Sequence, residues 1–302
     1  MLGLALELAL APLLLGVITR TKSWVSGRSG PPLLQLYFDL QKLLRKGAVY
    51  SRTTTWIFRA GPIISLASVL TASLVLPLGA SSSPMSFSGD VIVFAYLLAL
   101  GRFFTMAAAL DTGSSFEGMG ASREAAFSAL TEPALFLGLA ILCVSARSVT
   151  FADVWRSLPW STWGAAHPAY LAVAAALFAV LLAENARIPV DDPATHLELT
   201  MIHEVMVLDH SGPDLALILY AGAVKFFVIG ALLVHVLLPV PAQGGLPGAL
   251  VMVTGELALA ILVGITESVM ARLRLIRVPQ FLIGATAIAA LGLAVLLYRG
   301  QP

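Results

Sequence analysis

The chain of 302 residues is 58% hydrophobic and only 12% charged, with a formal net charge of +1. Its mean hydropathy of +0.90 excludes an ordinary soluble domain of this length and indicates an integral membrane protein. The near-neutral charge, without a basic run interleaved with aromatic residues, excludes nucleic acid as a partner. The single cysteine, Cys143, excludes a disulfide framework, an iron-sulfur cluster or a structural zinc held by this chain alone.

Eight apolar runs are long enough to cross about 30 Å of hydrocarbon as helices of about 20 residues. They cover residues 2–19, 62–79, 91–110, 125–145, 167–184, 214–237, 248–268 and 280–298. The first run has no basic segment before it and no cleavage site, so we interpret it as a retained helix, not a signal peptide. The sequence therefore predicts an all-α integral membrane protein with about eight transmembrane helices, forming a single domain over residues 1–302.

Most of the 18 lysines and arginines follow the first, third, fifth and seventh predicted helices. These four connections cover about 20–61, 111–124, 185–213 and 269–279. By the positive-inside rule they face the cytoplasm, and both termini then face outside. The opposite connections at 80–89 and 238–247 carry no charge. We expect a multi-pass protein of the cell (plasma or inner) membrane whose functional groups lie on the cytoplasmic side.

The first cytoplasmic connection contains "SGPPLLQLYFDLQKLLRKGAV", in which leucines recur at helical spacing. Lys42, Arg45 and Lys46 fall on the opposite side of this pattern, prolines precede it and Gly47 ends it. The pattern predicts an amphipathic helix over 31–46 that lies along the membrane surface. Two roles stay open for it, a lipid anchor and a platform for a cytoplasmic partner, and both can hold at once.

The third cytoplasmic connection follows the fifth predicted span and reads "ENARIPVDDPATHLELTMIHEVMVLDHSG". Asp192 as N-cap and Pro193 at the first helical position predict a helix that runs to about Asp209. On such a helix, histidines at a spacing of seven residues share roughly one face. These are His196, His203 and His210.

A metal site in this connection is not expected. Histidines seven residues apart lie about 10 Å apart along a helix axis and cannot bind one ion. The run "HEVMV" has Val207 where the second histidine of a zincin helix would stand. A docking surface for a protein partner, or a series of titratable groups that hand protons inward, fits the composition better.

Ionisable residues also fall inside the predicted spans, where a charge costs several kcal/mol and therefore faces a partner or a wet cavity. We interpret Glu132, Glu184 and Lys225 as functional. Glu7, Arg102, His235 and Glu267 are expected to form structural ion pairs or to lie near helix ends. The candidates for proton coupling are Glu132, Glu184, Asp191, Asp192, His196, Glu198, His203, Glu204 and Lys225. The candidates for docking a partner are Lys42, Arg45, Lys46 and Arg187.

Four motifs resemble one known family in the same order along the chain. They read "GRSGPPLLQLYFDLQKLLRK", "FEGMGASREAAFSALTEPAL", "AENARIPVDDPATHLEL" and "ESVMARLRLIRVPQFL". The chain resembles the subunit-1 family, the membrane-arm anchor subunit of respiratory complex I. It resembles more closely the homologues in membrane-bound nickel-iron hydrogenases (group 4) of the formate hydrogenlyase and energy-converting type. The positions that match the family pattern are Glu132, Glu184, Arg187, Pro189, Asp191 and Glu198.

The resemblance implies a subunit of an oxidoreductase complex without a catalytic centre or cofactor of its own. It implies partners: a cytoplasmic nickel-iron large subunit, an iron-sulfur small subunit, antiporter-like membrane subunits and membrane lipid. Redox energy would then be coupled to proton or sodium translocation. Asp192, Pro193 and His196 replace further acids of the complex I form, which favours the hydrogenase branch.

Two other functions stay open from the sequence. One is the quinone-site subunit of a respiratory complex I (NADH dehydrogenase). The other is a stand-alone ion transporter, although such a protein more often has repeats with broken helices in matching halves. We find no such repeat in this sequence.

Overall fold

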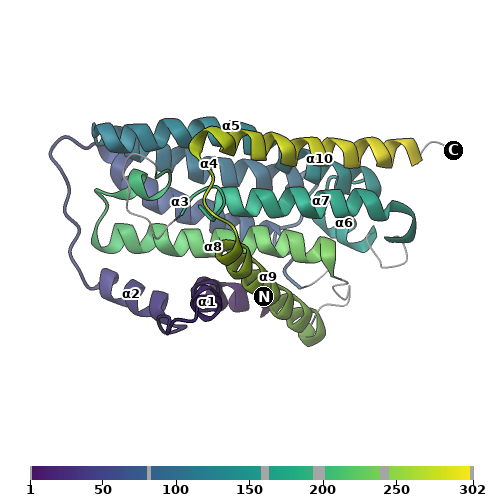
Figure 1. Cartoon of the computed structure of the whole chain (residues 1–302), viewed down its shortest axis with the longest axis horizontal. Helices are drawn as coiled ribbons and strands as arrows, with labels where there is room; N and C mark the ends of the chain where they lie inside the picture. Colours follow the sequence, from purple (N-terminus) through teal and green to yellow (C-terminus); the bar gives the residue numbers. More distant parts are fainter. Residues whose placement is uncertain (1, 80–82, 158–162, 193–200, 239–244, 300–302) are drawn as a thin grey trace.

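The computed structural model of the chain describes residues 2–79, 83–157, 163–192, 201–238 and 245–299 (Figure 1). In chain order the elements are α1 (Leu2–Val25), α2 (Gln35–Leu44), α3 (Trp56–Val75), α4 (Asp90–Asp111), α5 (Ser115–Ala146), α6 (Phe151–Ser157), α7 (Trp163–Glu184), η2 (Glu204–Val207), α8 (Gly212–Leu237), α9 (Gly245–Val269), η3 (Leu275–Arg277) and α10 (Val278–Arg299). No strand occurs among the described residues. The predicted all-helical class is confirmed.

Seven helical stretches of the described chain are long and apolar enough to cross a membrane. They are α1, α3, α4, α5, α8, α9 and α10, the last counted together with η3. The span predicted at 167–184 corresponds to α7, whose described apolar part, Pro168–Glu184, is shorter. The multi-pass architecture is confirmed, whereas the outward orientation of the termini stays a prediction.

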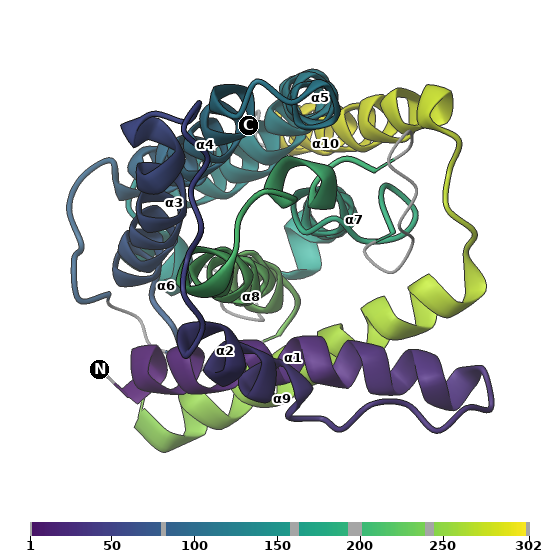
Figure 2. The ribbon, with the colours of Figure 1, turned by 90° about the vertical axis from the view of Figure 1, so that its left-hand side faces the viewer.

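Helix α8 occupies the centre of the molecule. Figure 2 shows it between α1 and α9 on one side and α3, α7, α5 and α10 on the other. Nearly all of its residues from Ala221 to Val236 are buried, as expected for a helix that is apolar on all sides. Helices α1 and α9 lie across the others, so that α1 is seen end-on in Figure 1 where α8 runs along the horizontal.

The crossing of α1 over α8 is fixed by a proline and a tyrosine. Pro12 has no amide hydrogen, so the carbonyl of Leu8, one turn earlier in α1, has no partner within the helix. The hydroxyl of Tyr220 on α8 donates to this carbonyl at 2.9 Å. An unpaired carbonyl is costly at membrane depth, and a neighbouring helix supplies the missing donor.

Most cytoplasmic features predicted from the sequence gather at one end of the bundle. Helix α2, the starts of α3, α5 and α8, and the ends of α4 and α7 all lie at the left of Figure 1. Helix α2 begins at Gln35, later than the predicted residue 31, and packs against α8 and α1 without burying any residue completely. Its basic side chains Lys42, Arg45 and Lys46 are exposed.

The connection predicted at 111–124 is largely helical, which corrects the sequence interpretation. Helix α5 begins at Ser115, well before residue 125. Its first turns pack against η2 so closely that a Cβ on Gly120 would collide with Val205 Cγ1. A hydropathy pattern misses these turns because protein, not lipid, covers them.

The helix predicted from Asp192 to about Asp209 is wrong for the part that the structure describes. Residues 201–211 contain only the 3₁₀ turn Glu204–Val207. The Asp191 carboxylate accepts the backbone amides of Ile202 (3.1 Å) and His203 (3.2 Å), so it folds the segment back onto the end of α7.

The histidines of this segment do not form one face. His210 stacks on Phe58 of α3, with ring centroids 4.0 Å apart. His203 points instead toward Asp191 and Glu124. His196 lies outside the described residues.

Candidate functional site

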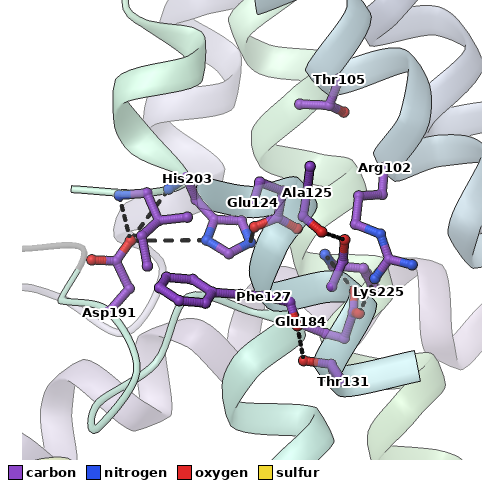
Figure 3. A network of polar contacts seen from close by, with 12 residues as sticks. Arg102, Thr105, Glu124, Ala125, Phe127, Thr131, Glu184, Asp191, His203 and Lys225 are labelled. Carbon is purple, nitrogen blue, oxygen red and sulfur yellow. Dashed lines mark hydrogen bonds and ion pairs between the residues drawn. The ribbon is translucent and has the colours of Figure 1, made fainter. Parts of the chain in front are cut away.

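Eight ionisable side chains from separate elements form two groups of direct contacts, here together called the ionic chain. Electrostatic attraction between Glu124 and Arg102, and between His203 and Glu184, joins the two groups. Helices α4, α5, α7 and α8 contribute to the ionic chain, together with the segment after α9 and the connection between α7 and α8. Of this connection, here called the 185–211 loop, residues 185–192 and 201–211 are described. Its members are Arg272, Asp191, His203, Glu124, Arg102, Glu132, Glu184 and Lys225. Figure 3 shows most of them between the loop and the helices.

His203 connects the loop part of the ionic chain to helix α5. Arg272 Nη2 lies 2.8 Å from Asp191 Oδ1, and His203 Nδ1 lies 3.8 Å from Asp191 Oδ2. On its other side, His203 Nε2 lies 3.3 Å from Glu124 Oε2 (Figure 3). The imidazole therefore stands between two carboxylates that belong to different elements.

Arg102 is the centre of the membrane part of the ionic chain. Its guanidinium donates through Nη1 to Glu184 and through Nη2 to Glu132. Glu184 Oε2 also lies 3.6 Å from Lys225 Nζ. The side chains of Arg102 and Glu184 are only 7% and 5% exposed, so this pair is well shielded, whereas Glu132 is 39% exposed on the surface of α5.

The groups in the loop have pKa values that favour their charged forms. Burial raises the pKa of the Asp191 carboxyl, but the contacts with His203 and Arg272 outweigh burial and lower this pKa below its usual range. Burial lowers the pKa of His203 and Lys225 opposes its protonation, but Glu124 and Asp191 outweigh both, so the net effect raises the pKa of His203.

This result agrees with the charge balance of the whole ionic chain. Its carboxylates exceed its lysine and arginine side chains by one. The eight side chains of the ionic chain therefore have no net charge when His203 carries a proton. Several members, among them Glu184 and Arg102, contact two groups of opposite charge. When one of these groups loses its charge, such a member can strengthen its contact with the other.

A second group of ion pairs lies beside the ionic chain and includes Arg187, one of the residues predicted to dock a partner. Glu267 of α9 contacts Lys22 of α1 at 2.8 Å and Arg187 of the loop at 3.5 Å. The Arg187 side chain is 11% exposed and points inward, unlike the exposed basic residues of α2. Burial lowers the pKa of Arg187, and Glu267 opposes that effect.

The ionic chain borders a cavity of about 250 Å³. One wall is charged and contains Arg102, Glu184, His203 and Lys225. The lining also includes the apolar residues Leu15, Val69, Leu98, Ile218 and Leu219. The charges thus lie at the edge of a space into which water or a small amphipathic molecule fits.

Metal binding has no support among the described side chains. No three His, Cys, Asp or Glu residues in the described ranges are placed to hold one ion. The acids of the ionic chain are engaged by cations of the protein itself. The expectation that this chain binds no metal or cofactor stays a prediction.

The structure brings together five of the residues selected from the sequence. Glu132, Glu184, Asp191, His203 and Lys225 are members of the ionic chain. Glu204 lines the cavity, and Asp192 follows Asp191 at the edge of the site. His196 and Glu198 lie outside the described residues.

Sequence reasoning left Glu124 and Arg272 out of the site and assigned Arg102 only a structural ion pair. Arg102 is an ionised residue within a span, which is by itself a signal of function, but its partners could not be identified because they are distant in sequence. Glu124 was missed because the fourth span was predicted to begin after it. Arg272 resembled one of several ordinary arginines in the seventh connection.

Comparison of the sequence with known proteins finds a matching family model and similar proteins. The family model described as NADH dehydrogenase matches residues 1–298. Formate hydrogenlyase subunit 4 of Escherichia coli (strain K12) is 34% identical over 278 residues, which are 90% of this chain and 89% of that protein. Hydrogenase-4 component C of the same organism is 35% identical over 232 residues, covering 77% of this chain and 72% of the relative.

A more distant relative and a solved structure extend the comparison. An NADH-quinone oxidoreductase subunit of Anaplasma phagocytophilum (strain HZ) is 28% identical over 222 residues, covering 67% of this chain and 62% of that protein. A chain from the membrane-bound sulfane sulfur reductase, an archaeal respiratory membrane complex, superposes with a TM-score of 0.84 at 19% identity. That match covers 97% of this chain and 96% of the other, and it shows that the fold is shared.

Proposed function

Since the chain belongs to the NADH dehydrogenase family, we propose that it is the membrane anchor and coupling subunit of a hydrogenase-type complex. In this role it has no catalytic centre. It holds a cytoplasmic redox module at the membrane and transmits the energy of electron transfer to the movement of protons or sodium ions. The two relatives above 30% identity support the hydrogenase branch, because their names assign them to formate hydrogenlyase and hydrogenase-4.

The observation that carries the proposal is the extent of the ionic chain. It begins at Asp191 and His203, in the loop at one end of the bundle, and reaches Glu132 and Lys225 inside membrane-spanning helices. Arg102 links the two carboxylates Glu132 and Glu184. A change of charge next to the loop can therefore alter ion pairs within the membrane, through the ion pairs within each group and the electrostatic attraction between the two groups, without movement of a whole helix.

The partners of the proposed complex would supply the redox chemistry. A nickel-iron large subunit and an iron-sulfur small subunit would bind at the end formed by α2 and the 185–211 loop. The exposed basic residues Lys42, Arg45 and Lys46 on α2 suit an acidic partner surface. Antiporter-like membrane subunits would then take up the charge displacement from the membrane part.

The proposal requires that α2 and the 185–211 loop face the cytoplasm. The basic residues concentrated at that end support this orientation. Reporter fusions should place residues 30–50 and 185–192 in the cytoplasm and residues 83–89 outside. An outward location of the 185–192 segment would contradict the docking and the coupling proposals together.

The decisive experiment separates electron transfer from ion movement in the intact complex. Glu132→Gln keeps an acceptor for Arg102 but removes the titratable group, and Glu184→Gln does the same beside Lys225. We expect both variants to assemble and to keep near-normal dye-linked redox activity in the cytoplasmic module. The number of ions moved per electron in membrane vesicles should fall.

A matched control lies at the opposite end of the bundle. Asp153 and Arg156 of α6 form an exposed ion pair at 3.8 Å, and Asp153→Asn should leave the ratio of ions to electrons unchanged. Equal ratios in wild type, Glu132→Gln and Glu184→Gln would reduce this chain to an anchor and refute the coupling role.

One observation favours a second candidate function, the binding of a quinone. The cavity combines an apolar wall with polar groups, as many ligand sites do, and a quinone oxidoreductase subunit is among the relatives. Its volume of about 250 Å³ is below the roughly 300–1,000 Å³ that is usual for small-molecule sites, which favours the coupling role. Reduction of a short-chain quinone by the purified complex, sensitive to Leu98→Trp, would support the second function instead.

A further inference from the structure

A second group of buried acids lies away from the ionic chain, where α1 crosses α9. Glu7 on α1 is 0% exposed and Glu256 on α9 is 1% exposed. Both stand in the same four-residue sequence, Glu-Leu-Ala-Leu. They lie on the two helices that pack across each other here, and Leu10, Leu13 and Leu14 of α1 line the same small cavity as Glu256. We call these two residues the acid pair.

No cation of the described chain neutralises the acid pair. Among the described residues, no lysine, arginine or histidine forms an ion pair with Glu7 or Glu256. The titratable group near Glu7 is Tyr220 on α8, a neutral donor to the carbonyl of Leu8 in α1, and Tyr37 on α2 lies beyond it as a donor to the carbonyl of Ala9. This contrasts with Glu267, another buried acid of α9, which contacts two cations.

The hydrogen bonds around Glu7 are compatible with a proton on its carboxyl group. Glu7 Oε1 lies 2.5 Å from Ser73 Oγ, and the same hydroxyl lies 3.0 Å from the carbonyl of Val69. A serine hydroxyl has one hydrogen. When that hydrogen is donated to Val69, a proton on Glu7 can fill the short contact with Ser73.

Glu256 is buried without a polar partner in the part of the chain that the structure describes. Neither of its carboxyl oxygens has a hydrogen-bond partner there, and Glu7 Oε2 has none either. The carboxyl lies against the backbone of α8, where a Cβ on Gly230 would be 2.6 Å from Glu256 Oε2. Its other neighbour is a cavity of about 20 Å³, large enough for one water molecule at about 10–15 Å³.

The surroundings of the cavity decide which ligand can neutralise Glu256. The other lining residues are apolar: Leu10, Leu13, Leu14, Phe227, Val253 and Leu257. A metal cation would find too few oxygen ligands here, since hard cations take about six or more. One water molecule cannot replace the solvation of two buried carboxylates, and no cation pairs with either of them among the described residues. The two therefore do not both stay ionised, because burying each charge costs several kcal/mol.

We propose that Glu7 and Glu256 form a proton-binding site inside the membrane part of the protein, separate from the ionic chain. Glu256 carries a proton at neutral pH, and Glu7 is the neighbour that shares or takes up a second one. The proposal does not depend on which complex the chain serves or on whether the ionic chain couples redox energy to ion movement.

Infrared spectroscopy of the full chain in lipid tests the site directly. A protonated carboxyl has a carbonyl stretching band that an ionised carboxylate lacks. At neutral pH the wild-type chain should show this band, and Glu256→Gln should remove a resolvable part of it. The matched control is Glu267→Gln on the same helix, which replaces an acid paired with Lys22 and Arg187 and should leave the band unchanged.

Stability provides an independent readout of the same difference. Glutamine imitates a neutral acid, so Glu256→Gln should unfold at the same temperature as wild type, whereas Glu267→Gln should unfold at a lower one. If Glu256→Gln does not fold, Glu7→Gln is the second variant, and it should shift the band in frequency by changing the neighbour of Glu256. An unchanged band in every folded variant of the two residues would overturn the proposal.

Discussion

The ionic chain and the acid pair both contain buried carboxyl groups. Those of the ionic chain are charged, whereas the acid pair holds a proton. Glu184 lies between Arg102 and Lys225, and Asp191 lies between Arg272 and His203. Glu7 and Glu256 have uncharged neighbours, namely Ser73, Tyr220, the backbone of α8 at Gly230 and apolar side chains. These four acids are about equally buried, so the neighbours, not the depth, decide whether an acid is charged.

The location of the two regions explains why they differ. The ionic chain lies where helices α4, α5, α7 and α8 meet the 185–211 loop, so the loop can contribute His203 and Asp191. The acid pair lies within the crossing of α1 and α9, where α3 and α8 are the other neighbours. At the crossing these two helices present a serine, a tyrosine and a glycine, and the lysine of α8, Lys225, contacts Glu184 instead. One region can therefore pass charge along, while the other can only gain or lose a proton.

The largest effect on stability is expected from removing the central cation of the ionic chain. Arg102→Gln leaves Glu184 buried beside only Lys225, and the loss of one partner from a buried pair typically costs about 3–5 kcal/mol. Chemical unfolding of the purified chain in lipid micelles would measure this loss. The double variant Arg102→Gln, Glu184→Gln should recover part of it, and a loss below about 1 kcal/mol would mean that water shields the pair.

A smaller effect is expected where the acid pair touches the backbone of α8. Gly230→Ala places a Cβ 2.6 Å from Glu256 Oε2, so the carboxyl or the helix must shift, at a cost of about 1–3 kcal/mol. Gly222→Ala on the same helix meets nothing within 4 Å and is the control, with no loss expected. Equal stability of the two variants would show that the carboxyl has room to move.

The helices were predictable because each membrane span needs a long apolar run. The prediction was wrong where protein contacts, not lipid, decide the structure. The start of α5 at Ser115 depends on contact with η2, and the 3₁₀ turn Glu204–Val207 depends on an Asp191 carboxylate that accepts amides across the loop. Neither contact leaves a periodic signal in the sequence.

The ionisable residues of the site were predictable, but their pairing was not. Glu132, Glu184 and Lys225 were selected because charges are rare at membrane depth. Arg102 joins two of them only through the packing of α4 against α5 and the end of α7, which brings together residues 30 and 82 positions apart in the sequence. Hydropathy carries no information on such contacts.

The two described histidines of the loop should respond to pH with opposite signs. Contacts with Glu124 and Asp191 raise the pKa of His203, so its contribution to stability is full below about pH 6.5, the value in the unfolded chain, and is lost as the pH rises through the raised pKa. Burial against Phe58 lowers the pKa of His210, so its contribution is full above about pH 6.5 and is lost toward acid.

Unfolding measurements between about pH 5 and pH 8 on His203→Gln and His210→Gln would detect this difference. A tenfold change in a proton-binding constant corresponds to about 1.4 kcal/mol, which such measurements resolve. The stability lost in His203→Gln should be larger at the acid end, and that lost in His210→Gln larger at the alkaline end. The same sign in both variants would remove His203 as the proton carrier of the ionic chain.

The smallest effect on the chain itself is expected on α2, which lies outside both regions. Lys42, Arg45 and Lys46 are exposed, so reversing them to glutamate should change the free energy of unfolding by no more than about 0.5 kcal/mol each. The same change should release the cytoplasmic partner from purified membranes, because complementary charge across an interface fixes the partner and its approach. High salt should weaken the wild-type association in the same direction.

Reversal of the exposed Arg156 at the opposite end of the bundle is the control and should leave the partner bound. Retention of the partner by the α2 variant would assign this helix to lipid, because its exposed apolar side chains, Leu34, Phe38 and Leu44 among them, are sufficient for an interfacial anchor. In that case the partner must dock on the 185–211 loop, next to Asp191 and His203. The ionic chain would then begin directly at the partner interface.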